Sequence, residues 1–310
     1  MVAPTGEQIV LESGGSRAVV GTVAAVLREL SVAGGVAVTE PFPEHATPPF
    51  GDGIVLAPWP NRVRDGIWLL DGVEQRLDLT ERARGNAIHG LLRNAEYTVV
   101  VRDAASVELR ALIPPQHGWP FLFDTRVRYE LRPDGITVTH TAVNLSARSA
   151  PWAVGAHPFL RVGDAPVEEL TVTVHAGSYF QLGDRLTPIA EHPVDGTDVD
   201  LRLGRPVAEL HLDTAFGGVT TLDGASARLE APDGAAVELV QDVDWGYLQV
   251  FMTREFPRQA GPGLAIAVEP MTAPPDALNS GDGLVWLDPG ETWEGSWGLR
   301  YSGPRSEVGG

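Results

Sequence analysis

The sequence predicts an all-β protein, built as one large antiparallel β-sandwich with few short helices. Three observations support this prediction. Strand-like runs rich in Val and Thr recur along the whole chain. The 35 glycines and 25 prolines indicate many turns between short elements. No window keeps a helical period of apolar residues over three turns without a Gly or Pro. Strands in series with short, turn-rich links are typical of antiparallel sandwiches.

The strand-like segments follow one another along the chain. Residues 16–38 are a Val-rich run that glycines interrupt, and residues 97–113 are two alternating runs around a turn. Residues 123–144 predict a hairpin that turns at Pro133-Asp134-Gly135. The pattern continues in residues 170–182, in a second predicted hairpin over 225–242, and in residues 247–253.

One domain is expected over residues 1–310. Hydrophobic residues make up 43% of the chain, enough for a sizeable core. The chain has no internal repeat, no low-complexity tract and no linker-like boundary. Its length suits a single large sandwich.

Charge and cysteine content exclude several functions. The formal net charge of −18 disfavours nucleic acid and anionic membranes as partners, because both carry negative charge. The absence of cysteine excludes disulfides, thiolate nucleophiles and zinc–cysteine sites. The N-terminal segment lacks a basic start and an apolar core, and no apolar run reaches membrane-spanning length. We therefore expect a soluble, cytoplasmic protein.

Five stretches interrupt the alternating pattern and place polar groups among Gly, Pro and aromatic residues. Glu269 follows the buried-looking run "LAIAV", and Pro270 is expected to end that strand. A carboxylate in such a place must be paired, hydrogen-bonded or shifted in pKa. The stretches are residues 56–68, 86–93, 151–164, 212–216 and 267–293.

The histidines need separate interpretation, because a lone histidine in an apolar context is more often structural than catalytic. His140 alternates with Ile136 and Val138, so we expect a core histidine with a hydrogen bond. His89 precedes Gly90, and His157 precedes a proline at a strand end. Taken singly, both packing and catalysis remain open for these two.

Known site motifs are absent from the sequence. It has no closely spaced metal-ligand cluster, no serine elbow, no phosphate loop and no dinucleotide fingerprint. What remains is two histidines, one carboxylate and Arg62 after Asn61. This set suits proton transfer without a metal or cofactor, since histidine titrates near neutrality and a buried glutamate can serve as a base.

Taken together and in order, these stretches resemble the aldose 1-epimerase (galactose mutarotase) family over roughly residues 20 to 300. "NRVRDG" resembles the family's Asn-Arg-Ile segment, "NAIHG" its His-Gly segment, and "GAHPF" its second histidine. "LDTAF" resembles an Asp-x-x-Phe segment. "EPMTAPPDALN" followed by "LDPGETW" resembles the C-terminal glutamate segment and its Leu-x-Pro-Gly ending. "LAPWPNRVRDG" and "AVEPMTAPPDALN" are similar to a branch that includes a bacterial sulfosugar mutarotase.

The resemblance implies a galactose mutarotase-like β-sandwich with the sugar site in a concave groove. It implies that Glu269 is the base and His157 the acid. His89 and Arg62, with Asn61 beside it, would position the sugar, and Asp213 would bind a ring hydroxyl.

Two tryptophans are further candidates. Trp59 lies beside Asn61 in the sequence, and Trp152 lies near His157. Because sugars present C–H faces that pack on indole rings, we expect at least one of the two to line the pocket. The alternative is that both anchor the core.

The expected function is an isomerase that interconverts the α and β anomers of a hexose without a cofactor. One alternative is a non-catalytic sugar-binding protein on the same scaffold. Another is a glycoside hydrolase, which needs two carboxylates across the scissile bond and could use Asp213 as the second. The expected partner is a small sugar, a neutral hexose by preference. A sulfonated sugar is the alternative, with extra cations from Arg62, Arg64, Arg93 and Arg161 around it. The sequence predicts no oligomeric state.

Overall fold

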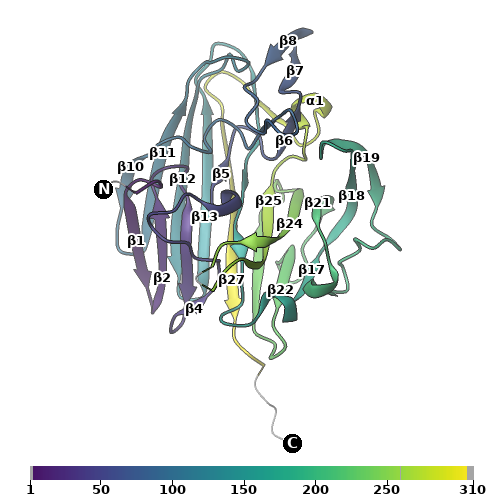
Figure 1. Cartoon of the computed structure of the whole chain (residues 1–310). Coiled ribbons are helices and arrows are strands. Elements are labelled where there is room, and N and C mark those ends of the chain that lie inside the picture. Colours follow the sequence, from purple (N-terminus) through teal and green to yellow (C-terminus); the bar gives the residue numbers. More distant parts are fainter. Residues whose placement is uncertain (1–2, 259, 306–310) are drawn as a thin grey trace, which may run out of the picture.

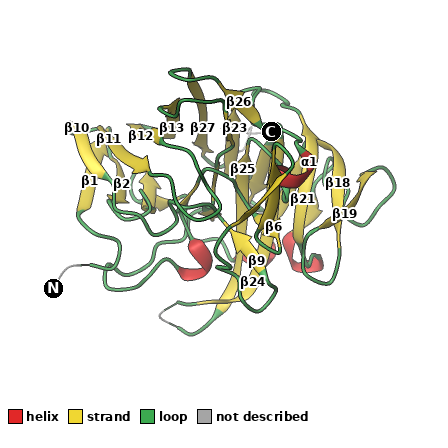
Figure 2. Cartoon of the chain, turned by 90° about the horizontal axis from the view of Figure 1, so that it is seen from above, coloured by secondary structure: helices red, strands yellow, loops and turns green. Residues whose placement is uncertain are grey.

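The structure, a computed structural model, describes residues 3–258 and 260–305 and confirms the all-β prediction. Two large antiparallel sheets of nine and eight strands form most of the molecule, and a four-stranded sheet packs at one side (Figure 1). Helix is confined, among the described residues, to α1 (Ala277–Ser280) and three short 3-10 turns (Figure 2). The turns are η1 (Pro49–Gly51), η2 (Val167–Glu169) and η3 (Val207–Glu209).

The nine-stranded sheet contains both predicted hairpins. The turn between β12 and β13 follows Arg132, which pairs with Gly135. The turn between β22 and β23 lies between Glu230 and Ala236, which also pair. The two runs of residues 97–113 pair as β10 and β11. In spatial order the strands are β10 (Thr98–Arg102), β11 (Ser106–Ile113), β12 (Phe123–Arg132), β13 (Gly135–Asn144), β27 (Thr292–Ser302), β23 (Ala236–Gln241), β22 (Ala227–Glu230), β17 (Thr171–Val174) and β20 (Arg205–Pro206).

The eight-stranded sheet carries the site described below. Its central strand β25 pairs with β24 on one side and with two short strands, β15 and β16, on the other. In spatial order the strands are β19 (Pro188–Pro193), β18 (Ala176–Leu182), β21 (Asp213–Val219), β24 (Tyr247–Phe256), β25 (Gly263–Met271), β15 (Gly155–Ala156) and β5 (Val55–Leu56), with β16 (Phe159–Leu160) beside β25.

Smaller sheets complete the fold. The Val-rich run of residues 16–38 divides at its glycines into strands of the four-stranded sheet. That sheet comprises β1 (Gln8–Ser13), β2 (Ser16–Gly21), β3 (Leu27–Val32) and β4 (Val36–Ala37). Three two-stranded ribbons are β6 (Arg62–Arg64) with β9 (Asn86–Ile88), β7 (Ile67–Leu70) with β8 (Val73–Arg76), and β14 (Ala150–Trp152) with β26 (Val285–Leu287).

The core lies between the sheets and follows the period of the strands. Along β12, buried and less buried residues alternate at every position, as a strand with one face in the core requires. One continuous apolar cluster includes residues of both large sheets. His140 is buried in it and accepts a hydrogen bond from Trp297 Nε1 at 3.1 Å, which confirms the predicted core histidine.

Over the described parts of the chain, no helix is both long and apolar enough to cross a membrane.

Candidate active site

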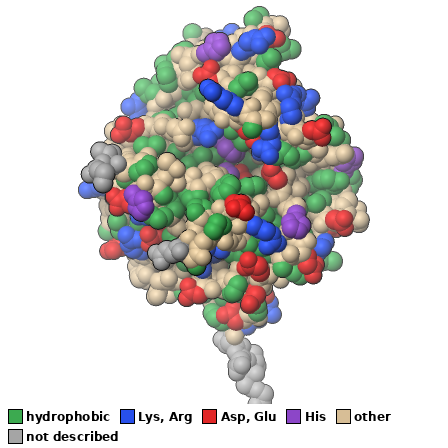
Figure 3. All heavy atoms as spheres, in the orientation of Figure 1, with side chains coloured by type: hydrophobic (Ala, Val, Ile, Leu, Met, Phe, Trp, Pro, Cys, Tyr) green, Lys and Arg blue, Asp and Glu red, His purple; other side chains and the backbone are tan. Residues whose placement is uncertain are grey.

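A cavity of about 570 Å³ opens over the eight-stranded sheet, and most of the predicted site residues line it. Figure 3 shows histidine side chains recessed among arginine and carboxylate side chains near the middle of this face. The predicted residues that line the cavity are Asn61, Arg62, His89, Arg93, His157, Asp213 and Glu269.

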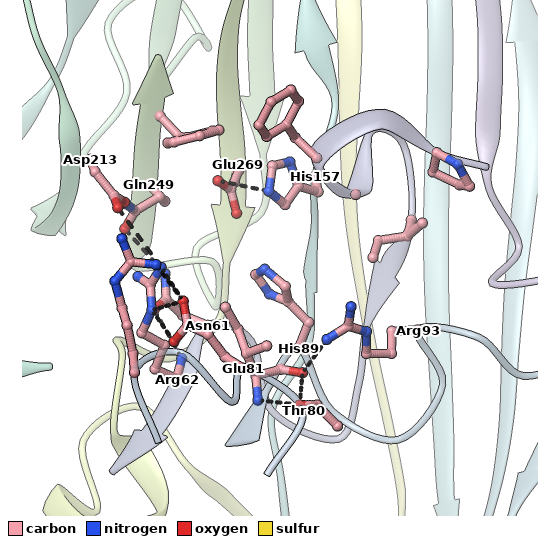
Figure 4. A pocket seen from close by; sticks show the side chains of 17 residues that line it. Asn61, Arg62, Thr80, Glu81, His89, Arg93, His157, Asp213, Gln249 and Glu269 are labelled. Carbon is pink, nitrogen blue, oxygen red and sulfur yellow. Dashed lines mark hydrogen bonds and ion pairs between the residues drawn. The ribbon is translucent and has the colours of Figure 1, made fainter. Parts of the chain in front are cut away.

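The floor of the cavity is a row of three residues across adjacent strands. Gln249 on β24 pairs directly with Glu269 on β25. The pairs Gly155–Met271 and Phe159–Ala267 on either side place His157 opposite Glu269 in the same register. Side chains of directly opposed residues point to the same face of a sheet. His157 Nε2 therefore lies 3.4 Å from Glu269 Oε1, and both side chains are buried (Figure 4).

Glu269 lies within its strand rather than at its end, which corrects the prediction that Pro270 ends the strand. β25 continues to Met271, and Pro270 pairs with Leu248. Backbone bonds hold the ladder on both sides of this proline: Val268 N–H donates to the Pro158 carbonyl and Thr272 N–H to the Val154 carbonyl. A single missing N–H is tolerated because the neighbouring ladder bonds remain in place.

A hydrogen-bonded chain forms one wall of the cavity. Asn61 Nδ2 donates to Gln249 Oε1 at 3.3 Å, and Gln249 Nε2 donates to Asp213 Oδ1 at 2.6 Å. Arg62 lies 3.8 Å from Asp213 Oδ2. Asp213 begins β21, next to β24, so sheet pairing brings it to this wall from a distant part of the sequence. The wall thus presents both donors and acceptors, as recognition of sugar hydroxyls requires.

Glu81, which the sequence analysis missed, fixes the arginine of this wall. Arg62 donates to both carboxylate oxygens of Glu81, with its Nε 3.0 Å from Oε2 and its terminal nitrogen 3.1 Å from Oε1. Arg84 and Asn86 donate to the same carboxylate. Burial alone would raise the pKa of Glu81, but the hydrogen bonds from Arg62 and Asn86 outweigh it and lower that pKa.

His89 reaches the cavity from the β6–β9 ribbon. Its own backbone is left-handed, with φ 62°, and its N–H donates to the Asn61 carbonyl at 2.9 Å. Its ring lies 5.4 Å from that of His157, edge to face. Gly90 follows with φ 69°, and a Cβ there would lie 2.0 Å from the Ala57 carbonyl oxygen. This glycine is therefore needed for close backbone packing against residue 57.

Burial suppresses charge on the residues of the floor. It lowers the pKa of His157 to about 4. Burial, together with the charges of His157, Arg93 and Arg62, also lowers the pKa of His89. Burial raises the pKa of Glu269 well above its ordinary value, and nearby Asp213 adds to the effect while Arg62 opposes it. Between the lowered pKa of His157 and the raised pKa of Glu269, the pair therefore holds one proton.

The two predicted tryptophans do not line the cavity, which corrects that expectation. Trp59 and Trp152 are both 2% exposed. Trp59 packs 5.7 Å from the Trp119 ring, and Trp152 packs 5.3 Å from the Phe123 ring. Their indoles fill the interior of the sandwich, where large apolar surfaces are most stabilising.

The cavity takes its aromatic residues from elsewhere. Phe50 and Phe251 line it instead of the two tryptophans. Phe50 belongs to the η1 turn at the rim, and Phe251 belongs to β24.

Of the four arginines named as extra cations, the structure brings two to the cavity. Arg64 pairs with Asp276 and Arg161 with Glu40, each away from the lining. Arg62 is neutralised by Glu81. Arg93 forms no ion pair with any described residue, and its buried Nε has no hydrogen-bond partner there. Figure 4 shows Arg62 and Arg93 on opposite sides of His89.

Groups of three or more side chains suited to hold a metal ion are not found among residues 3–258 and 260–305. With its own side chains the cavity can carry out proton transfer between two buried groups, beside a wall of hydrogen-bond donors and acceptors.

Comparisons with known proteins show the family of the chain. A family model described as aldose 1-epimerase matches residues 7–300. The chain is 32% identical over 289 residues to the uncharacterized protein YihR of Escherichia coli K12, covering 93% of this chain and 91% of YihR.

Two solved structures show the same fold. A galactose mutarotase-like protein of Clostridium acetobutylicum superposes with a TM-score of 0.83 at 20% identity, covering 97% of each chain. A galactose 1-epimerase of Lactobacillus acidophilus superposes with a TM-score of 0.78 at 17% identity, covering 96% of this chain and 95% of its own.

Proposed function

The chain belongs to the aldose 1-epimerase family, and from that premise we propose that it interconverts the α and β anomers of a hexose by acid–base ring opening and reclosure. The observation that supports this most strongly is the buried Glu269–His157 pair on the cavity floor. Two proton-transfer groups beside one sugar carbon are what mutarotation needs, and sugar binding alone has no use for them.

In the proposed mechanism Glu269 is the base and His157 the acid. Glu269 removes the proton from the anomeric hydroxyl while His157 donates a proton to the ring oxygen. The C1–O5 bond breaks and gives the open-chain aldehyde. Rotation about C1–C2 exposes the other carbonyl face, and both proton transfers then run in reverse to close the ring as the other anomer.

The proton count of the pair is consistent with these steps. Burial favours the neutral pair with its proton on Glu269, so ring opening in this direction first needs that proton to move to His157, which gives a carboxylate and an imidazolium. After ring opening the pair is again a carboxylic acid and a neutral imidazole. Both states hold one proton in total. Burial opposes charge on either group, so the dry cavity favours the neutral pair that accompanies the open-chain sugar.

The remaining polar groups are proposed to hold the sugar. Arg62, fixed by Glu81, and the Asn61–Gln249–Asp213 chain would bind ring hydroxyls on one side. His89, which follows β9 in the same ribbon as Arg62, would also contact the sugar. Groups that are already bonded to one another lose little freedom on binding, which favours a well-defined pose.

A neutral hexose is the proposed substrate class, because Arg62 and Arg84 are both engaged by Glu81. A second candidate is an aldose with an anionic group, and unpaired Arg93 favours it. The Michaelis constant for an anionic sugar should rise steeply with ionic strength, whereas that for a neutral one should stay nearly constant.

Polarimetry of freshly dissolved α-anomers tests the proposal. The panel should contain neutral, phosphorylated and sulfonated aldoses, together with glycosides of the same sugars. Faster approach to the equilibrium rotation with a free aldose supports a mutarotase. Release of free sugar from a glycoside would instead indicate a hydrolase. Saturable binding without either reaction would indicate a binding protein.

A further inference from the structure

A strained and exposed aromatic residue stands at the mouth of the cavity. Phe50, in the η1 turn, has left-handed backbone angles of φ 53° and ψ 18°. Bulky side chains seldom adopt this conformation. Its ring is also 46% exposed, although it lines the cavity. Such strain tends to persist at ligand-binding positions, so these two features together indicate a binding role for the ring.

The same turn packs directly on the proposed acid. A Cβ on Gly51, the next residue, would lie 3.6 Å from His157 Cδ2. The Phe50 ring lies 6.2 Å from that of Phe251, which in turn lies 6.3 Å from the His157 ring, edge to face. Phe50 and Phe251, with Pro48 and Ile54, make an apolar wall on the His157 side of the cavity, here called the phenylalanine wall.

The proposed mechanism determines which part of a sugar would meet this wall. His157 protonates the ring oxygen, which is bonded to C1 and C5, so on the side away from C1 the nearest atoms are C5 and the exocyclic C6 that it carries. The four side chains of the phenylalanine wall contain no hydrogen-bonding group. A hydroxyl on C6 would lose its hydrogen bonds to water there and find no new partner. A methyl group at the same place would bury apolar surface favourably.

We propose that the phenylalanine wall binds C6 of the sugar and that the enzyme prefers 6-deoxyhexoses to the corresponding hexoses. Phe50 is then a specificity-determining residue, and covering its exposed ring is part of substrate binding. This inference rests on the proposed function, because only the role of His157 fixes the orientation of the sugar.

The test compares mutarotation of 6-deoxygalactose with galactose, and of 6-deoxyglucose with glucose. We expect wild-type kcat/KM to favour the deoxy sugar in at least one pair by on the order of 10-fold, the scale at which an apolar pocket discriminates one small group. Phe50→Asn removes the ring and keeps a residue that tolerates left-handed backbone. In this variant the ratio should fall toward one, mainly through KM, with kcat changed less than about twofold.

Leu69→Asn is the matched control. Leu69 is also a large exposed apolar residue, 62% exposed, but it belongs to the β7–β8 ribbon and does not line the cavity. The Leu69→Asn variant should leave both kcat/KM ratios unchanged.

Activity on both members of each pair with wild-type ratios near one would overturn this inference and leave the proposed function standing. A wild-type preference for the deoxy sugars that the Phe50→Asn variant retains would also overturn this inference. Wild-type protein that accelerates mutarotation of none of the four sugars would count against the neutral-hexose function and this inference together.

Discussion

At the scale of single residues, the site depends on two buried groups that share one proton. Glu269 and His157 lie 3.4 Å apart on opposed strands, and Gln249 flanks the glutamate on its other side. Neither charged form is favoured by burial alone. Burial therefore favours a neutral pair in the free protein, with the shared proton on Glu269.

Replacing the proposed base tests this arrangement directly. Glu269→Gln keeps the shape of the side chain and removes its ability to accept a proton. We expect folding and sugar binding to survive and kcat to fall about 10²-fold or more, as for the loss of one positioned base. His157→Asn should cause a comparable loss. The double variant should be little worse than either single one, because both residues serve one coupled transfer.

Polarimetry gives the rate, and equilibrium titration with sugar gives the affinity. A Glu269→Gln protein that folds, binds sugar and turns over near the wild-type rate would exclude Glu269 as the base.

The pH dependence of the reaction follows from the same proton. Below about pH 4 His157 gains a proton while Glu269 keeps its own, so no base remains. Above the raised pKa of Glu269 the pair loses its only proton, so no acid remains. We expect kcat/KM to fall about tenfold per pH unit on the acid side, below about pH 4, and to fall again above the raised pKa of Glu269. An acid limb centred near pH 6.5 would instead indicate an ordinary, exposed histidine.

At the scale of elements, the close contact of Gly90 with residue 57 holds the β6–β9 ribbon in place. The Ala57 carbonyl accepts bonds from Leu91 and Leu92, and a Cβ on Gly90 would clash with that carbonyl. Gly90→Ala adds this clash, on the order of 1–3 kcal/mol, to a left-handed backbone penalty of about 1–2 kcal/mol.

Chemical denaturation measures the loss, and Gly72→Ala is its control. Gly72 also has a positive φ, 77°, but an added Cβ meets nothing within 4 Å. The control should therefore show the backbone penalty alone. Equal losses in both variants would show that the packing at Ala57 contributes nothing.

Sequence patterns anticipated the strands and hairpins because alternation and turn residues are local signals. They also singled out His89, His157 and Glu269, which interrupt that alternation beside Gly or Pro. Gln249 escaped notice because it is an ordinary alternating residue of β24, and only the register with β25 makes it a neighbour of Glu269.

Glu81 and Phe50 escaped notice for a similar reason. Each lies in a polar or proline-rich loop whose course depends on distant contacts. The prediction for Trp59 and Trp152 was wrong, because closeness in sequence to Asn61 and His157 did not mean closeness to the cavity.

At the scale of the whole molecule, buried histidines make the fold sensitive to acid. The buried core position of His140 lowers its pKa to about 3, while in the unfolded chain it titrates near 6.5. Between these values the unfolded chain binds a proton that the folded protein does not. Stability therefore falls as the pH drops from 6.5 toward 3.

His140→Gln separates this contribution from the others. The amide can still accept the Trp297 hydrogen bond but cannot bind a proton. Urea unfolding at pH 7 and pH 5 should show a smaller stability loss on acidification for the variant than for wild type. The pKa of His140 falls from 6.5 to about 3, which corresponds to roughly 5 kcal/mol in full, and roughly 2 kcal/mol of this lies between pH 7 and pH 5, at about 1.4 kcal/mol per pH unit. Identical losses in the two proteins would contradict the assignment of acid sensitivity to His140.

The cations that line the cavity are Arg62, Arg84 and Arg93, and this uniformity extends to the whole chain: none of its 23 basic residues is lysine. The proposed mutarotation forms and recloses a reactive aldehyde at every turnover. Aldehydes condense with lysine amines to form imines, whereas a guanidinium stays protonated and inert at neutral pH. An enzyme built only with arginine thus offers its own open-chain sugar no side-chain amine, and its side chains should resist glycation even after long incubation with concentrated substrate.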